Sequence, residues 1–218
     1  MNDQRTTGNH ATLARWLGLW SSEADQAALR AIHSDLARRY GEPHRHYHTL
    51  RHVSRCLQEL DEARPQADHP LEVEVALWFH DAVYDPRSGD NEEASARYAQ
   101  EALGSLIQGE PLNRVASLIL ATKHIDPPTS NDAKLTADID LAVLGSSAKE
   151  YREYEDGIRL EYSWLPEVIF KAGRAEVLAW FLFRERIYHT DHFREKYEEN
   201  ARANLSRSIS KLRASRPR

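Results

Sequence analysis

The sequence predicts an all-α protein, and two observations favour this class. Apolar residues recur at intervals of three and four positions through most of the 218 residues, which is the spacing of one face of a helix. Alternating runs of β-branched residues between turn signals, the pattern typical of strands, do not occur. Because the sequence contains no internal repeat and no long linker, we expect a single domain over residues 1–218.

Breaks in this periodicity place the expected helices in order. Ser22 suits an N-cap and Gly41-Glu42-Pro43 a helix end, so the second helix is expected between them. Pro65 ends the third helix, the turn-rich loop 85–90 follows the fourth, and Pro111 suits the first turn of the sixth. The expected helices span residues 12–19, 22–41, 47–63, 71–84, 91–107, 111–124, 138–144, 147–163, 166–188 and 192–212.

The fourth of these helices differs from the others. It follows Pro70, reads LEVEVALWFHDAVY and is apolar around almost its whole circumference toward its end, as expected of a central buried helix. Its His80-Asp81 pair stands among these apolar residues. An ionised carboxylate buried there would cost several kcal/mol unless a cation compensates its charge. A divalent metal shared with histidine nitrogens is one interpretation, and a structural Asp–His pair is the other.

Composition narrows the function classes. Hydrophobic residues make up 41% and charged residues 29% of the chain, as in ordinary globular proteins, and the formal charge of -5 offers no basic surface for long nucleic acids. The only cysteine, Cys56, excludes an intramolecular disulfide or a thiolate cluster and is expected in the core. Without a secretory signal or an apolar run long enough to cross a bilayer, we expect a cytoplasmic protein with no membrane partner.

The C-terminal residues 207–218 are an exception to the acidic balance. They include Arg207, Lys211, Arg213, Arg216 and Arg218. We expect a solvated helix end followed by a frayed tail, and a contact with an anionic partner is the alternative.

Histidine is unusually frequent, with eleven residues, of which four lie at positions 44, 46, 48 and 52. On a helix, His48 and His52 project from one face and could address a common ion or anion, although surface histidines often have this spacing. The histidine cluster alone is therefore weak evidence for a metal.

A further acidic site strengthens the metal interpretation. Asp138 and Asp140 are flanked by aliphatic residues in the segment TADIDL. In chain order, His52, His80-Asp81 and one of these aspartates come from separate helices and combine imidazole with carboxylate. Such a set suits Mn, Fe, Mg, Zn or Co and leaves coordination positions open for water and substrate, as a hydrolytic metal requires.

The order His, His-Asp, Asp on successive helices resembles the HD-domain superfamily of metal-dependent phosphohydrolases. The sequence is similar to one bacterial branch of predicted phosphohydrolases from about residue 10 to residue 206. The resemblance implies a helical bundle with a metal site among its central helices, held by His52, His80, Asp81 and either Asp138 or Asp140. The other aspartate could orient a ligand histidine. The matching stretches are YHTLRH (47–52), WFHDAVYD (78–85), DNEEASA (90–96), ATKH (121–124) and DIDLAVLG (138–145).

Three charged residues near these motifs are candidates for catalysis. Glu92 and Asp85 could accept a proton from an attacking water, although acidic residues near a helix N-terminus also interact favourably with the helix dipole. Lys123 could bind phosphate, or it could simply stabilise the C-terminal end of its helix.

Four further residues are candidates for substrate binding: His48, His124, Arg159 and Arg174. His124 could also bind a second metal. Arginine recognises phosphate bidentately, although salt bridges within the protein explain many arginines.

We therefore expect a metal-dependent hydrolase that uses a metal-activated water. Its partner would be a small phosphorylated metabolite or a nucleotide, a class implied by the resemblance alone. Some HD-fold proteins instead hold two irons and oxidise their substrates with dioxygen; here His48 and His124 could supply the extra ligands. A non-catalytic module that binds a nucleotide or a protein partner is the third hypothesis. The oligomeric state is left open, with a homodimer among the alternatives.

Overall fold

The computed structural model describes residues 9–214, and all regular secondary structure in this part of the chain is helical. This confirms the predicted all-α class. The elements are α1 (Leu13–Gly18), α2 (Gln26–Tyr40), α3 (Leu50–Ala63), η1 (Arg64–Gln66), α4 (Pro70–Phe79), α5 (Asn91–Leu103), α6 (Glu110–Ala121), α7 (Asn131–Leu141), η2 (Ala142–Gly145), α8 (Ala148–Glu161), α9 (Glu167–Leu182) and α10 (Asp191–Ala214).

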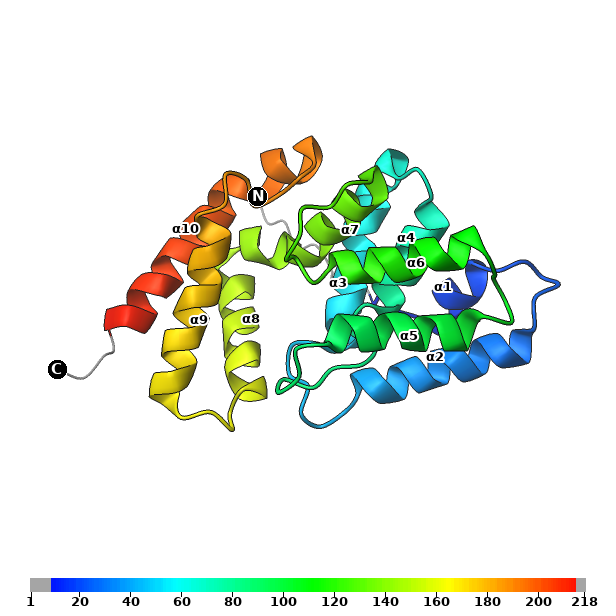
Figure 1. Ribbon diagram of the computed structural model, residues 1–218, viewed down its shortest axis with the longest axis horizontal. Helices are drawn as coiled ribbons and strands as arrows, with labels where there is room; N and C mark the ends of the chain where they lie inside the picture. Colours follow the sequence, from blue (N-terminus) through cyan, green and yellow to red (C-terminus); the bar gives the residue numbers. More distant parts are fainter. Residues whose placement is uncertain (1–8, 215–218) are drawn as a thin grey trace.

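The helices form two groups that share one hydrophobic core. Figure 1 shows α1, α2, α4, α5 and α6 on one side of the molecule and α8, α9 and α10 on the other, with α3 and α7 between them. Helix α4 supplies a continuous buried run from Val73 to Phe79, which explains why its sequence is apolar on all faces. The middle of the molecule is therefore where α3, α4 and α7 can bring side chains together.

Helix α4 ends at Phe79, which is earlier than the expected residue 84. Side chains from other segments bind the carbonyls at this end: the Tyr40 hydroxyl donates to the Trp78 carbonyl at 3.0 Å, and Arg45 donates to the carbonyls of Asp81 and Ala82. These contacts satisfy groups that a helix end leaves unpaired. His80 and Asp81 consequently lie in the turn after the helix rather than within it.

Other helix limits also differ from the expected ones. Helix α2 begins after Asp25 instead of Ser22, because the Asp25 carboxylate accepts hydrogen bonds from the amides of Ala27 and Ala28. Helix α7 begins at Asn131 rather than near residue 138, with Ser130 as its N-cap. Helix α9 ends at Leu182 rather than 188.

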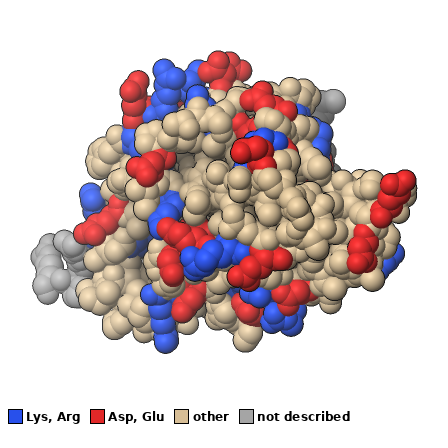
Figure 2. Space-filling model, turned by 45° about the vertical axis from the view of Figure 1, so that its right-hand side comes forward, with Lys and Arg blue, Asp and Glu red and all other residues tan. Residues whose placement is uncertain are grey.

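The C-terminal helix α10 is regular through Ala214. The part of the expected tail between 207 and 214 is therefore helical, and residues 215–218 lie outside the described residues. Between residues 9 and 214, no helix has the length and apolar character needed to cross a membrane. On the face shown in Figure 2, acidic and basic side chains lie next to one another instead of forming a surface of one sign.

Candidate metal centre

His80 directs one ring nitrogen toward the middle of the molecule. The residue directly follows α4 and is 1% exposed. Its Nδ1 lies 2.9 Å from the Leu77 carbonyl oxygen, and because a carbonyl can only accept, Nδ1 carries the hydrogen. The lone pair of the neutral ring is then on Nε2, which lies 3.0 Å from Nε2 of His52. A carbonyl that fixes the tautomer in this way is typical of metal-binding histidines.

Two carboxylates complete the cluster around these imidazoles. Asp81 Oδ2 lies 3.0 Å from His80 Nε2 and 3.6 Å from His52 Nε2. Asp140 Oδ1, from α7, lies 3.0 Å from His52 Nε2 and 3.5 Å from His80 Nε2. The structure thus brings together four of the residues predicted as ligands.

The spacing of these atoms fits a single ion. Atoms bound at about 2.1 Å to one metal stand roughly 3.0 Å apart at right angles and roughly 3.4 Å apart at tetrahedral angles. The distance between the two nitrogens and the four distances from these nitrogens to the carboxylate oxygens range from 3.0 to 3.6 Å. Two imidazole nitrogens and two carboxylate oxygens are also ordinary ligands for a divalent transition metal.

The electrostatics of the cluster are those of a site that requires positive charge. Burial lowers the pKa of His80, but the adjacent Asp81 outweighs this effect and raises the pKa well above its ordinary value. Burial would raise the pKa of Asp140, yet hydrogen bonds from His124, His52 and His80 hold it well below its ordinary value. Burial would raise the pKa of Asp81 too, but the neighbouring His80 and His48 lower it. Both carboxylates of the cluster are therefore ionised, and a divalent cation would balance them.

Asp138 and Asp140 occupy different surroundings, although both project from α7. The Asp138 carboxylate accepts hydrogen bonds from the His189 amide at 2.8 Å and from the amide and hydroxyl of Thr190, each at 2.7 Å. It is fully buried and lies at the entry to α10. Asp138 therefore caps this segment, and Asp140 is the aspartate of the pair that lies in the histidine cluster.

Cys56 reaches the cluster as well. One ligand atom from each of His52, Cys56, His80 and Asp140 lies within 4.8 Å of the others. The sulfur is 3.8 Å from Nδ1 and 3.7 Å from Nε2 of His52, so it contacts the imidazole between its two nitrogens. Cys56 is buried, as expected of a core residue, and burial raises the pKa of its thiol. The four-residue spacing from His52 along α3 is the signal that could have suggested its nearness to the site.

Arg45 is a supporting residue that the sequence did not indicate. Its guanidinium is buried and donates to the carbonyls of Asp81 at 2.6 Å, Ala82 at 3.1 Å and His48 at 3.3 Å. One side chain therefore joins the His-Asp turn to the segment that leads into α3. This contact positions Asp81 through its own backbone.

Glu161, at the end of α8, holds the same segment from the other side. One carboxylate oxygen accepts hydrogen bonds from the amides of His46, Tyr47 and His48 at 2.8 to 2.9 Å. The other accepts from the Tyr84 hydroxyl at 2.9 Å and lies 2.7 Å from His48 Nδ1. Burial would raise the pKa of Glu161, but its hydrogen bond with His48 and the further donors lower it to about 2. Glu161 is thus an ionised, buried anchor for the entry to α3.

Of the residues predicted for catalysis, Glu92 is one whose pKa responds to a carboxylate of the cluster. Burial raises the pKa of Glu92, and the charge of Asp81 contributes in the same direction. Lys123 forms an ion pair with Glu93. The exposed Asp85 accepts a hydrogen bond from the Arg87 amide within the loop before α5. Their catalytic roles stay predictions.

The residues predicted to bind substrate divide into two pairs. His48 and His124 border the cluster: His124 Nε2 lies 2.8 Å from Asp140 Oδ2, and the His48 ring lies 6.1 Å from that of His52. Arg159 instead donates to the carbonyls of Tyr162 and Leu165.

Arg174 likewise does not stand in the cluster. It pairs with Glu155 and donates to the Tyr154 hydroxyl. The Tyr154 ring packs on Tyr47, which in turn packs on His52. Arg174 is therefore separated from the cluster by two aromatic rings.

Comparison with protein-family models, with curated proteins and with solved structures finds no match to this chain.

Proposed function

We propose that His52, His80, Asp81 and Asp140 hold a divalent metal ion and that the chain hydrolyses a phosphate ester or anhydride of a small metabolite or nucleotide. The observation that carries the metal assignment is the set of 3.0 to 3.6 Å distances between four potential ligand groups. The resemblance of the ligand order to the HD-domain superfamily supports the reaction class. Two imidazole ligands favour Mn, Fe, Co or Zn over Mg.

A bound ion would supply a water of lowered pKa and would draw negative charge from the phosphoryl oxygens. The protein contributes the proton acceptor. Glu92 is the best candidate, because burial and the charge of Asp81 raise its pKa and no other side chain forms a hydrogen bond with it within the described part of the chain. In the proposed reaction the water oxygen forms a bond to phosphorus and Glu92 takes a water proton. The bond from phosphorus to the leaving oxygen breaks, the leaving oxygen takes a proton from solvent, and Glu92 returns its proton to solvent.

His48 supplies positive charge beside the reacting group. Burial lowers its pKa, but the charges of Asp81 and Glu161 raise it above the ordinary value. Since Nδ1 faces Glu161, Nε2 is the ring atom available to a phosphoryl oxygen. Glu161 therefore fixes the orientation of a candidate substrate-binding residue.

The test is a hydrolysis screen of mononucleotides, sugar phosphates and pyrophosphates with each candidate metal, followed by the Glu92→Gln variant on the best substrate. We expect kcat to fall by about 10²–10⁴-fold with a small change in KM. Glu101→Gln, at an exposed site on the same helix, is the control and should keep full activity. Unchanged kcat in Glu92→Gln would remove Glu92 from the mechanism.

Assays on the same purified protein distinguish two other functions. Iron-dependent consumption of dioxygen would indicate a di-iron oxygenase. In this structure His48 faces Glu161 and His124 faces Asp140, so the two histidines stand beside different carboxylates. Metal binding without turnover of any substrate would favour a binding module.

A further inference from the structure

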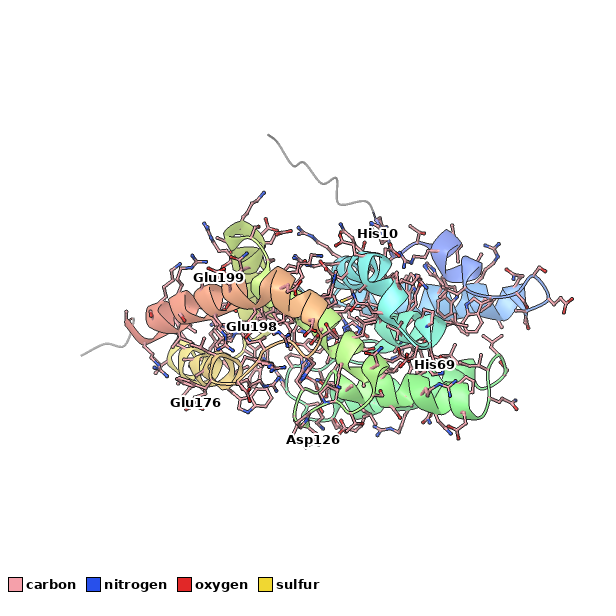
Figure 3. The ribbon with its side chains drawn as sticks, turned by 90° about the horizontal axis from the view of Figure 1, so that it is seen from above. His10, His69, Asp126, Glu176, Glu198 and Glu199 are labelled. Carbon is pink, nitrogen blue, oxygen red and sulfur yellow. The ribbon has the colours of Figure 1, made fainter. Side chains whose placement is uncertain are left out.

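A pocket of about 360 Å³ lies beside the metal cluster, between the loop that follows α6 and the C-terminal part of α9. His124 lines this pocket and also contacts Asp140, so one side chain connects the pocket with the cluster. In Figure 3, Asp126 of the loop and Glu176 of α9 lie along the same edge of the molecule. The volume falls within the range of small-molecule sites.

One wall of the pocket is apolar and contains an accessible aromatic ring. Trp180 is 46% exposed and Ile125 is 61% exposed, and both line the pocket together with Pro127 and Pro128. Large apolar side chains that remain open to solvent around a concave surface are typical of ligand sites. The indole and the proline rings offer flat surfaces on which a planar group can stack.

The pocket also contains a guanidinium that is available to an anion. The Arg184 guanidinium lies 3.7 Å from the centre of the Trp180 ring and donates to the His124 carbonyl. Among residues 9–214, no carboxylate lies within ion-pair distance of it, and its burial lowers its pKa without compensation from an acid. A partly buried arginine without an acidic partner has an uncompensated charge and can bind an anion.

His189 lies close enough to Arg184 for its pKa to respond to that charge. His189 lines the same pocket, and burial together with the nearby Arg184, His124 and Lys134 lowers its pKa. The two acidic residues of the pocket, Asp126 and Glu185, are both exposed. Arg184 and His189 thus lie in the less exposed part of the pocket, whereas the acids and Arg186 lie at its exposed edge.

We propose that this pocket binds a small organic anion with a planar ring, whose anionic group contacts Arg184 and His189 and whose ring stacks on Trp180. None of the four proposed metal ligands lines this pocket, which meets the cluster through His124. Its ligand therefore binds whether or not the chain hydrolyses phosphate esters.

The probe for this proposal is phenylphosphonate, which combines a ring with a phosphate-like group and cannot be hydrolysed at an ester bond. Titration calorimetry on the full chain, with and without EDTA, should show one binding event that EDTA does not remove. Inorganic phosphate and phenol should each bind at least about tenfold more weakly than phenylphosphonate. An event that EDTA abolishes would place the ligand on the metal and overturn the proposal.

Substitutions of pocket residues then test whether phenylphosphonate binds in this pocket. We expect Arg184→Gln to weaken phenylphosphonate binding by about tenfold or more. Arg87→Gln is the matched control, because Arg87 also stacks on an indole, that of Trp164, outside the pocket. Since Arg184 also holds the His124 carbonyl, His189→Gln and Trp180→Leu provide independent tests, and each should weaken binding severalfold. Wild-type affinity in all three pocket variants would overturn the proposal.

Discussion

At the residue scale, the identity of the carboxylate partner decides what each aspartate of α7 does. Asp140 faces three histidine rings, whereas Asp138 faces two backbone amides and a hydroxyl. The two side chains are chemically identical and two positions apart. Their substitutions should therefore have different consequences, one for metal binding and the other for stability.

We expect Asp140→Asn to lower metal affinity by more than about a hundredfold, because removal of a group that only orients a ligand already costs 10- to 100-fold. Asp138→Asn should keep the metal and lower the free energy of unfolding by about 1–2 kcal/mol through weaker hydrogen bonds. Metal analysis and thermal unfolding of both variants check this. Loss of metal in Asp138→Asn with retention in Asp140→Asn would reverse the assignment.

Glu161 makes stability depend on pH in a defined direction. Its ordinary pKa of 4.5 is lowered to about 2 in the folded chain, so the ionised form stabilises the fold. This contribution, about 3 kcal/mol, is complete above the unfolded pKa and is lost as the pH falls toward 2. In chemical denaturation, the stability difference between the wild type and Glu161→Gln should be largest above about pH 5 and shrink below it. The exposed Glu153→Gln serves as control, and a difference that grows toward low pH would contradict this account.

At the scale of elements, the ligands stand where helices end, and side chains from distant segments fix these ends. Tyr40 binds the Trp78 carbonyl at the end of α4, and Tyr188 binds the Leu141 carbonyl at the end of α7, each at 3.0 Å. Both tyrosines are buried. The geometry of the cluster therefore depends on how α2 and the segment before α10 pack.

The segment after α7 packs against α10 with no space for a side chain at Gly145. A Cβ atom there would lie 2.5 Å from Cβ and 2.6 Å from the carbonyl oxygen of Tyr197. Gly145→Ala should thus lower the free energy of unfolding by at least about 2 kcal/mol. Gly173, within α9, has no atom within 4 Å of such a Cβ.

Gly173→Ala is the control for this substitution and should be neutral or stabilising by up to about 1 kcal/mol. Chemical denaturation of both variants measures the pair. Equal stability of the two variants would show that α10 is not closely packed at Gly145.

At the scale of the whole molecule, the candidate centre lies where the two groups of helices meet. α3, the turn after α4 and α7 supply the ligands, while α8 holds the entry to α3 through Glu161. An ion bound there would connect segments that are far apart in the sequence. Metal binding should consequently stabilise the whole fold and not one helix alone.

Much of this arrangement could be predicted from the sequence, because helical periodicity and the polar pair within an apolar run are local patterns. His52 and His80-Asp81 were identified in this way. The choice between Asp138 and Asp140 could not be made, since both have aliphatic neighbours and only the position of residues 189 and 190 separates them. Likewise, the contact between Glu161 and the segment before α3 joins residues more than a hundred positions apart.

The helix ends show the same limit. His80 and Asp81 were expected inside a helix, but Tyr40 and Arg45 bind the carbonyls around Phe79 and the chain turns there. The residues of the run LEVEVALWFHDAVY do not indicate that Tyr40 and Arg45 will bind its carbonyls. Helix limits that depend on tertiary contacts are beyond what local sequence specifies.

The most direct test of the metal centre is the uptake of a divalent ion by the full chain after treatment with EDTA. Titration calorimetry with Mn²⁺, Co²⁺ and Zn²⁺, paired with thermal unfolding, measures stoichiometry and stabilisation together. We predict one ion per chain, a higher melting temperature with the ion, and loss of both effects in Asp140→Asn. A chain that binds no divalent ion, or an Asp140→Asn variant that binds it as the wild type does, would contradict the account.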